Sequence, residues 1–166
     1  TEEILAPNTS SFRLFEVAGD GNCLFLSVAH QIYGNVTKHA TVRKECMTYV
    51  ENNREKYLYF IMAESLKPHE LQTVEKSQKE FEHMSFNDRF DTYVQVKKKI
   101  GVYGDHIELA AMSSIYKRPI EVYVIQTNGA YDLMTRHVDK EVVENAIPIR
   151  LSYENQNHYN AIDIIT

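Results

Sequence analysis

The chain has 166 residues, a formal net charge of −5, and 43% hydrophobic and 25% charged residues. These values are typical of one globular domain with a substantial hydrophobic core. They argue against nucleic-acid binding, which usually needs a basic face, and no apolar run approaches the roughly 20 residues that span a bilayer. We expect one domain over residues 1–166, with no nucleic-acid or membrane partner.

The first two thirds of the chain predict a short lead-in followed by helices. Residues 1–10 form a flexible lead-in, residues 12–17 a short strand or extended entry segment, and residues 19–22 a glycine-containing turn. The helical spacing of apolar residues then predicts helices over residues 23–33, 39–52, 54–66, 70–81, 87–99 and 106–116.

Residues 54–86 are called the helical arm below. Within it, residues 69–85 are polar, and the helix expected over residues 70–81 has a thin apolar face. The only basic cluster, Lys97 to Lys99, follows the arm, and we interpret it as a solvated helix end.

The last third of the chain predicts strands. They cover residues 120–125, 131–134, 147–153 and 158–165, and Asn128-Gly129 forms a hairpin turn between the first two. Helices come first and strands later, without regular alternation, which favours an α+β fold with a helical lobe packed on a small sheet.

The cysteine content and the N-terminus bear on the cellular setting. The chain has two cysteines, Cys23 and Cys46, too few for a disulfide framework, and no CxxC pair indicates zinc. Its start lacks the basic region and apolar core of a signal peptide, and has no initiator Met. We expect a monomeric domain of a larger protein in a reducing compartment, the cytoplasm and also the nucleus, without metal or cofactor.

Cys23 lies where the turn becomes an apolar helix. Free backbone N–H groups and the positive end of the helix dipole favour a thiolate at such a position. Cys46 lies within a helix among apolar positions and has no turn before it, so we expect it in the core.

His158 and Asn160 stand two residues apart near the C-terminus. On a strand such residues face the same side, so the Asn160 amide can reach the imidazole and fix its tautomer. Cysteine, histidine and asparagine in this chain order form the triad of a thiol protease. Tyr159 should point into the core, and the five histidines other than His106 and His158 show no metal-ligand spacing.

Three blocks of the sequence resemble the ovarian-tumour (OTU) deubiquitinases. Residues 20–25 (Asp-Gly-Asn-Cys-Leu-Phe) are similar to the family's catalytic cysteine motif, and residues 157–160 (Asn-His-Tyr-Asn) to its histidine motif. Residues 103–112 are similar to its glycine-rich turn and helix, with His106 as in the OTUD-type branch. The resemblance covers about residues 12–162 and implies a papain-like OTU fold with a mostly antiparallel sheet. Residues 66–86 match least and look like an insertion.

The resemblance implies a thiol isopeptidase that acts on ubiquitin or polyubiquitin chains. Cys23 is then the nucleophile, His158 the acid and base, and Asn160 the residue that orients His158. Backbone N–H groups of the turn, at Gly21 and Asn22, are expected to hold the oxyanion. Asp20 is counted with the active site by resemblance, but its carboxylate can equally be only a turn-former, since a negative charge would raise the thiol pKa.

The third block is a candidate substrate contact. The tail of ubiquitin ends in two glycines, and Gly104, His106 and Glu108 are candidates for lining its channel. The alternative is a simple loop followed by a capping box, in which Glu108 caps the helix that begins after Asp105.

Three other functions remain open at this point. One is a hydrolase for another ubiquitin-like modifier, and one is a non-catalytic ubiquitin-binding module. The presence of Cys23, His158 and Asn160 argues against the binding module, which needs none of them. A thiol-dependent transferase is compatible with the chemistry, but no acyl-donor motif supports it.

Overall fold

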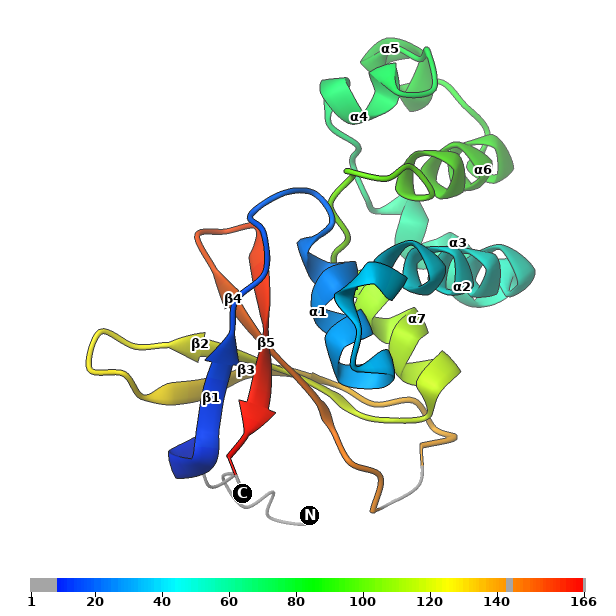
Figure 1. Cartoon of the computed structure of the whole chain (residues 1–166). Helices are drawn as coiled ribbons and strands as arrows, with labels where there is room; N and C mark the ends of the chain where they lie inside the picture. Colours follow the sequence, from blue (N-terminus) through cyan, green and yellow to red (C-terminus); the bar gives the residue numbers. More distant parts are fainter. Residues whose placement is uncertain (1–8, 143–144, 166) are drawn as a thin grey trace.

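A computed structural model describes residues 9–142 and 145–165, and places a lobe of helices on one side of a β-sheet (Figure 1). The predicted lead-in lies largely outside the described residues, and Thr9–Ser11 at its end forms a short 3₁₀ helix. No helix among the described residues is long and apolar enough to cross a membrane.

The sheet has five strands in the order β1-β5-β4-β2-β3. Strands β2 and β4 pair in parallel, and the other three pairs are antiparallel. The α+β class with a mostly antiparallel sheet is therefore confirmed. The strands are β1 (Phe12–Phe15), β2 (Ile120–Ile125), β3 (Tyr131–His137), β4 (Ile149–Glu154) and β5 (His158–Ile164).

The helical lobe packs on the sheet mainly through α1, which contacts β5 and β4. Helix α2 lies beside α1, α7 lies beside α2, and the arm extends away from the sheet (Figure 1). The helices are α1 (Cys23–Tyr33), α2 (His39–Asn52), α3 (Arg54–Met62), α4 (Pro68–Gln72), α5 (Gln78–Glu82), α6 (Phe86–Lys97) and α7 (His106–Tyr116). A 3₁₀ helix, Val36–Lys38, joins α1 to α2.

The third helix ends earlier than predicted, at Met62 instead of Leu66. Tyr57 and Ile61 form its buried face, and Leu66 is also buried. In a continued helix, Leu66 would lie nearly opposite Ile61, because residues turn by about 100° each. The chain therefore has to leave the helix to bury both side chains.

The helix predicted over residues 70–81 is two short helices, α4 and α5. Glu75 between them adopts a left-handed conformation with φ of 58°. The N–H of Lys76 bonds to the carbonyl of Leu71 at 3.0 Å, which closes α4 as a Schellman motif. Ser77 then caps α5 by accepting from the N–H of Glu80 at 3.0 Å.

The interpretation of Lys97 to Lys99 as a solvated helix end is wrong for Lys97. This side chain is buried at the end of α6 and forms an ion pair with Glu70 at 3.3 Å. Lys98 and Lys99 are exposed, as expected.

Candidate active site

Cys23 is the first residue of α1, and its side chain reaches the start of β5. The residue is only 1% exposed. Its Sγ accepts a hydrogen bond from the N–H of Tyr159 at 3.5 Å, and donates to the carbonyl of Asn157 at 3.6 Å. The two predicted motifs, far apart in the sequence, therefore meet at this sulfur. In the sequence, His158 stands between Asn157 and Tyr159, the two residues whose backbone contacts Sγ.

The surroundings of Cys23 favour the neutral thiol in this arrangement. Burial raises the pKa of the Cys23 thiol, and the negative charge of Asp20 raises it further. The N–H groups of Tyr159 and Leu24 act in the opposite direction without overcoming burial. The second cysteine, Cys46, is free and buried as predicted, and burial raises its pKa well above the ordinary value.

The imidazole of His158 is oriented by Asn160. The Nε2 atom of His158 lies 2.8 Å from Oδ1 of Asn160, and the N–H of Val17 donates to the same oxygen at 3.0 Å. At the other end of the amide, Nδ2 donates to Glu154 at 3.3 Å. Because Oδ1 accepts, Nε2 carries the proton when His158 is neutral, and Nδ1 is left as the base. Nδ1 is buried and has no hydrogen-bond partner among the described residues.

Asp20 shapes the turn before Cys23. Its exposed carboxylate accepts from the N–H of Asn22 at 2.9 Å, and its carbonyl accepts from the N–H of Cys23 at 3.2 Å. The N–H groups of Asn22, one of the two residues expected to hold an oxyanion, and of Cys23 are thus bonded within the turn. They have to be released before they can bind a substrate oxygen, so the oxyanion role of this turn remains a prediction.

Gly21 and Asn22 fasten the turn to the segment after α6. A Cβ on Gly21 would lie 1.6 Å from the carbonyl oxygen of Gly101, so only glycine fits here. The side-chain Oδ1 of Asn22 accepts from the N–H of Gly101 at 2.7 Å, and also from Arg43 at 3.1 Å. The Asn22 side chain therefore holds the turn to the backbone of Gly101 and to Arg43.

Arg43 on α2 is a residue of the site that the sequence reasoning did not identify. It is 1% exposed, and its guanidinium lies 4.2 Å from the ring centre of Phe25. It donates to the carbonyls of Gly21 at 3.2 Å and Lys97 at 2.8 Å. Burial lowers its pKa to about 10, so it stays charged near neutral pH. The sequence feature that could have identified Arg43 is its position three residues before buried Cys46, on the buried face of α2.

The three candidate substrate contacts have different surroundings. Gly104 packs on α1, since a Cβ there would lie 2.8 Å from Cδ2 of Leu24. The side chain of His106 is 54% exposed, and Nε2 lies 2.7 Å from Glu64 of the loop after α3. Contact with substrate remains a prediction for these two residues.

Glu108 is completely buried, so its expected direct contact with substrate is corrected here. Its carboxylate accepts from the N–H of Asp105 at 2.9 Å, as predicted for a cap, and from the hydroxyl of Tyr93 at 2.7 Å. Burial raises the pKa of Glu108. Tyr159 is buried as predicted, and its hydroxyl donates to Asp105 at 3.3 Å.

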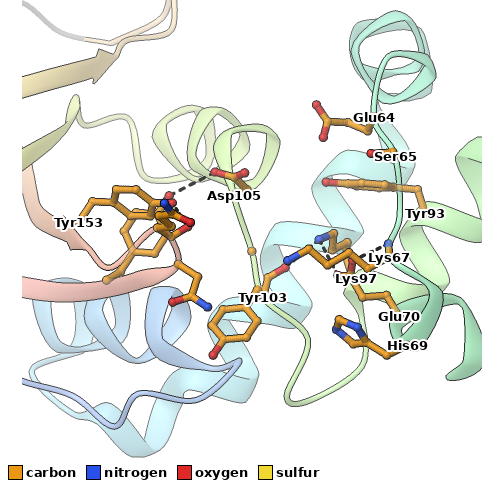
Figure 2. Close-up of a pocket in the computed structure, with 14 residues that line it drawn as sticks. Glu64, Ser65, Lys67, His69, Glu70, Tyr93, Lys97, Tyr103, Asp105 and Tyr153 are labelled. Carbon is orange, nitrogen blue, oxygen red and sulfur yellow. Dashed lines mark hydrogen bonds and ion pairs between the residues drawn. The ribbon is translucent and has the colours of Figure 1, made fainter.

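A pocket of about 140 Å³, called the pocket beside Cys23 below, does not include Cys23 itself in its lining. Its lining includes Asn157 and Tyr159, the two residues whose backbone contacts the sulfur. Figure 2 shows arm residues such as Glu64 on one side of this pocket and Tyr153 on the other. Within residues 9–142 and 145–165, no three His, Cys, Asp or Glu side chains are grouped as metal ligands.

Comparisons with known proteins agree with this geometry. The profile of the family described as OTU-like cysteine protease matches residues 18–159. The OTU domain-containing protein 5-A of Danio rerio is 32% identical over 151 residues, 91% of this chain and 22% of that protein. The ovarian tumor domain-containing deubiquitinating enzyme 6 of Arabidopsis thaliana is 29% identical over 160 residues, 93% of this chain and 25% of its own length.

A solved structure has the same fold. The Hazara virus OTU, solved bound to ubiquitin, has a TM-score of 0.64 at 17% identity, and the match covers 95% of this chain and 84% of that one. The chain spans about a quarter or less of the length of the two curated relatives. With the profile matching most of the sequence, and with Cys23 and the His158 motif meeting at one site, the chain belongs to the OTU-like cysteine protease family.

Proposed function

We propose that the chain is a deubiquitinase, which hydrolyses the isopeptide bond between the C-terminal glycine of ubiquitin and a lysine. The observation that carries the proposal is the oriented His158, with Nε2 bonded to Asn160 and a buried Nδ1 free to act as a base. The name of the plant relative and the ubiquitin bound to the viral neighbour support ubiquitin as the substrate.

The first chemical step requires a change at Cys23. The Cys23 thiol donates to the carbonyl of Asn157, so we infer that the side chain turns toward Nδ1 of His158 before its proton transfers. The resulting thiolate attacks the glycine carbonyl, and the imidazolium gives the proton to the departing lysine amine. Asn160 keeps the imidazole in one orientation throughout.

The second step releases ubiquitin. Water attacks the thioester between Cys23 and the glycine, His158 accepts its proton, and the thiol returns when that proton is given back to sulfur. In both steps a negative oxygen develops next to the turn of residues 20–23. Each N–H that binds this oxygen would contribute about 3–4 kcal/mol, as in other hydrolases.

The pocket beside Cys23 is our proposed entry for the ubiquitin tail. It is bounded by Asn157 and Tyr159 on the β5 side and by Gly104 on the α7 side. Backbone close to Gly104 can approach an extended substrate, because this residue has no side chain. His106, which is exposed next to the pocket residue Glu64, is placed to contact the same tail.

The experiment that tests the proposal uses ubiquitin with an electrophilic C-terminus. We expect a covalent adduct with the wild type and with the Cys46→Ala control, and none with Cys23→Ala. An adduct that persists in Cys23→Ala would overturn the assignment of the nucleophile.

Absence of an adduct with all three proteins, when they are folded, would overturn ubiquitin as the direct substrate of this chain alone. Tails of other ubiquitin-like modifiers would then be tried on the same three proteins. Reaction with one of them would identify a hydrolase for that modifier. Binding of ubiquitin without reaction would identify a binding module or an enzyme that needs activation.

A further inference from the structure

The arm is held to the rest of the helical lobe by a buried ion pair. Glu70 on α4 lies 3.3 Å from Nζ of Lys97, and the two side chains are only 9% and 10% exposed. The same Nζ donates to the carbonyl of Tyr103 at 2.8 Å and lies 5.5 Å from the ring centre of Tyr93. One ammonium group therefore joins α4, the end of α6 and the loop before α7.

The backbone of Lys97 is connected to the catalytic turn. Its carbonyl accepts from Nη1 of Arg43 at 2.8 Å, while Nη2 of the same guanidinium donates to the carbonyl of Gly21 at 3.2 Å. A second connection follows shortly after α6, where the N–H of Gly101 donates to Asn22 at 2.7 Å. The end of α6 and the loop after it are thus connected to the turn before Cys23 in two places, once through Arg43 and once through Gly101.

These contacts form one continuous path from the arm to the nucleophile. The links through Lys97 and through Arg43 each contain a buried charge, and a buried charge that loses its partner has to find another or return to water. If Glu70 or the amine of Lys97 is removed, the remaining charged group is left without its ionic partner. A shift at the end of α6 would relieve this loss, and it would also move the carbonyl that Arg43 holds.

We propose that Lys97 is a positioning residue for the hydrolysis. Its side chain fixes the arm, and its carbonyl, through Arg43, fixes the turn that precedes Cys23. Docking of α4 on Lys97 thereby sets the geometry of the turn, in addition to shaping the pocket that Glu70 and Lys97 both line. This inference rests on the proposed thiol hydrolysis and assigns to the arm a role in the rate of the reaction.

The test compares Lys97→Met and Glu70→Gln with a neighbouring ion pair. Lys98 is the next residue on the chain and pairs with Glu51, but both side chains are exposed, at 43% and 48%. Lys98→Met and Glu51→Gln therefore remove the same kinds of charge from the same region without touching the path. The Met substitution retains the aliphatic part of lysine and thus most of its packing.

Two substrates separate positioning from binding by the arm. One is ubiquitin with a fluorogenic amide at its C-terminus, and the other is a short fluorogenic peptide ending in Arg-Gly-Gly, which is too small to cover the arm. For the peptide we expect kcat to fall about 10-fold in Lys97→Met and less in Glu70→Gln, because small displacements of reacting groups reduce rates by this order. Both control variants should match the wild type.

A rise in KM for ubiquitin, with an unchanged kcat for the peptide, would overturn the proposal and leave the arm as a binding surface only. An equal loss of kcat in Lys98→Met would also overturn it, since the loss would then come from the change in net charge and not from the contacts of Lys97. If Lys97→Met does not fold, Glu70→Gln decides the question by the same comparison.

Hydrogen exchange provides a readout that does not depend on the substrate. The amide of Gly101 should exchange faster in Lys97→Met than in Lys98→Met, because its bond to Asn22 is weakened. If the wild type hydrolyses neither substrate, the proposed function fails, and the exchange rates still show whether Lys97 holds the turn. Equal exchange in the two variants would contradict the path itself.

Discussion

At the scale of single residues, the site depends on how one amide is held. Asn160 has a fixed donor on its oxygen, the N–H of Val17, and a fixed acceptor on its nitrogen, the carboxylate of Glu154. Reversing the amide would place two donors together at Val17 and two acceptors together at Glu154. The orientation is therefore determined from both ends, and with it the tautomer of neutral His158.

Asp20 gives the first prediction, which separates its charge from its role in the turn. In Asp20→Asn, the side-chain oxygen can still accept from the N–H of Asn22, but the negative charge that raises the pKa of Cys23 is gone. We expect the thiol pKa to fall modestly. Alkylation by iodoacetamide at pH 7 should then become about 2- to 3-fold faster, because the thiolate is the reacting form.

The measurement is the rate of Cys23 alkylation as a function of pH. It uses a Cys46→Ala background, so that Cys23 is the thiol that reacts. Glu16→Gln is the control, since Glu16 is exposed but does not contribute to the raised thiol pKa. If Asp20 only forms the turn, Asp20→Asn keeps its kcat while Asp20→Ala loses it. A large loss of kcat in Asp20→Asn would instead show that the charge itself is needed.

At the scale of elements, sequence patterns predicted the regular parts of the fold well. The bounds of α1, α2, α7 and β2 match the prediction, because each has a clear apolar face and a turn or cap at its ends. The split between α4 and α5 was missed because Glu75 closes α4 in a conformation that glycine usually adopts. The cap of α5, formed by Ser77 and Glu80, was visible in the sequence.

The parts of the site that residues close in sequence form were predictable. The parts that residues distant in sequence form were less so. Cys23, His158 and Asn160 stand in short local motifs, and the contact between His158 and Asn160 follows from strand geometry. Arg43 and Lys97 are charged residues that become buried only because partners from other elements meet them. Composition treats such residues as surface positions, because charged side chains are rarely buried without a partner.

The arm gives the second prediction, which concerns binding. Lys67, Lys76 and Lys79 are exposed on or beside α4 and α5, and Lys67 also lines the pocket. If the arm helps to hold ubiquitin, reversing these charges to Glu should raise KM for ubiquitin about 2- to 5-fold with little change in kcat. The largest effect is expected for Lys67→Glu.

Steady-state kinetics on ubiquitin with a fluorogenic C-terminal amide measure this effect. Lys140→Glu is the matched control, because Lys140 is exposed after β3 and does not line the pocket beside Cys23. An unchanged KM in all three arm variants would exclude the arm from the binding surface. Such a result would leave the proposed path through Lys97 intact, because that path involves a buried pair.

At the scale of the whole molecule, the sheet and the helical lobe are joined after β3 by Asp139. Its carboxylate accepts a hydrogen bond from Ser114 on α7 and lies 2.9 Å from Nζ of Lys56 on α3. Ser114 and then Lys56 lower the pKa of Asp139 from 3.8 to about 2. One side chain therefore links two helices to the segment that leaves the sheet.

The third prediction follows from this lowered pKa. Because the folded state holds the carboxylate as an anion, Asp139 stabilises the fold above its unfolded pKa of 3.8, and this contribution is lost as the pH falls through about 2. We expect Asp139→Asn to lower the free energy of unfolding by about 1–2 kcal/mol at pH 7, and by about half as much at pH 3.

The control is Asp91→Asn, which removes a carboxylate that is 52% exposed in its ion pair with Arg54 and should change the free energy of unfolding by less than about 0.5 kcal/mol. Urea unfolding of the three proteins at both pH values measures the difference. A cost of Asp139→Asn that is the same at pH 3 as at pH 7 would show that packing, and not the charge of Asp139, joins the sheet to the helices.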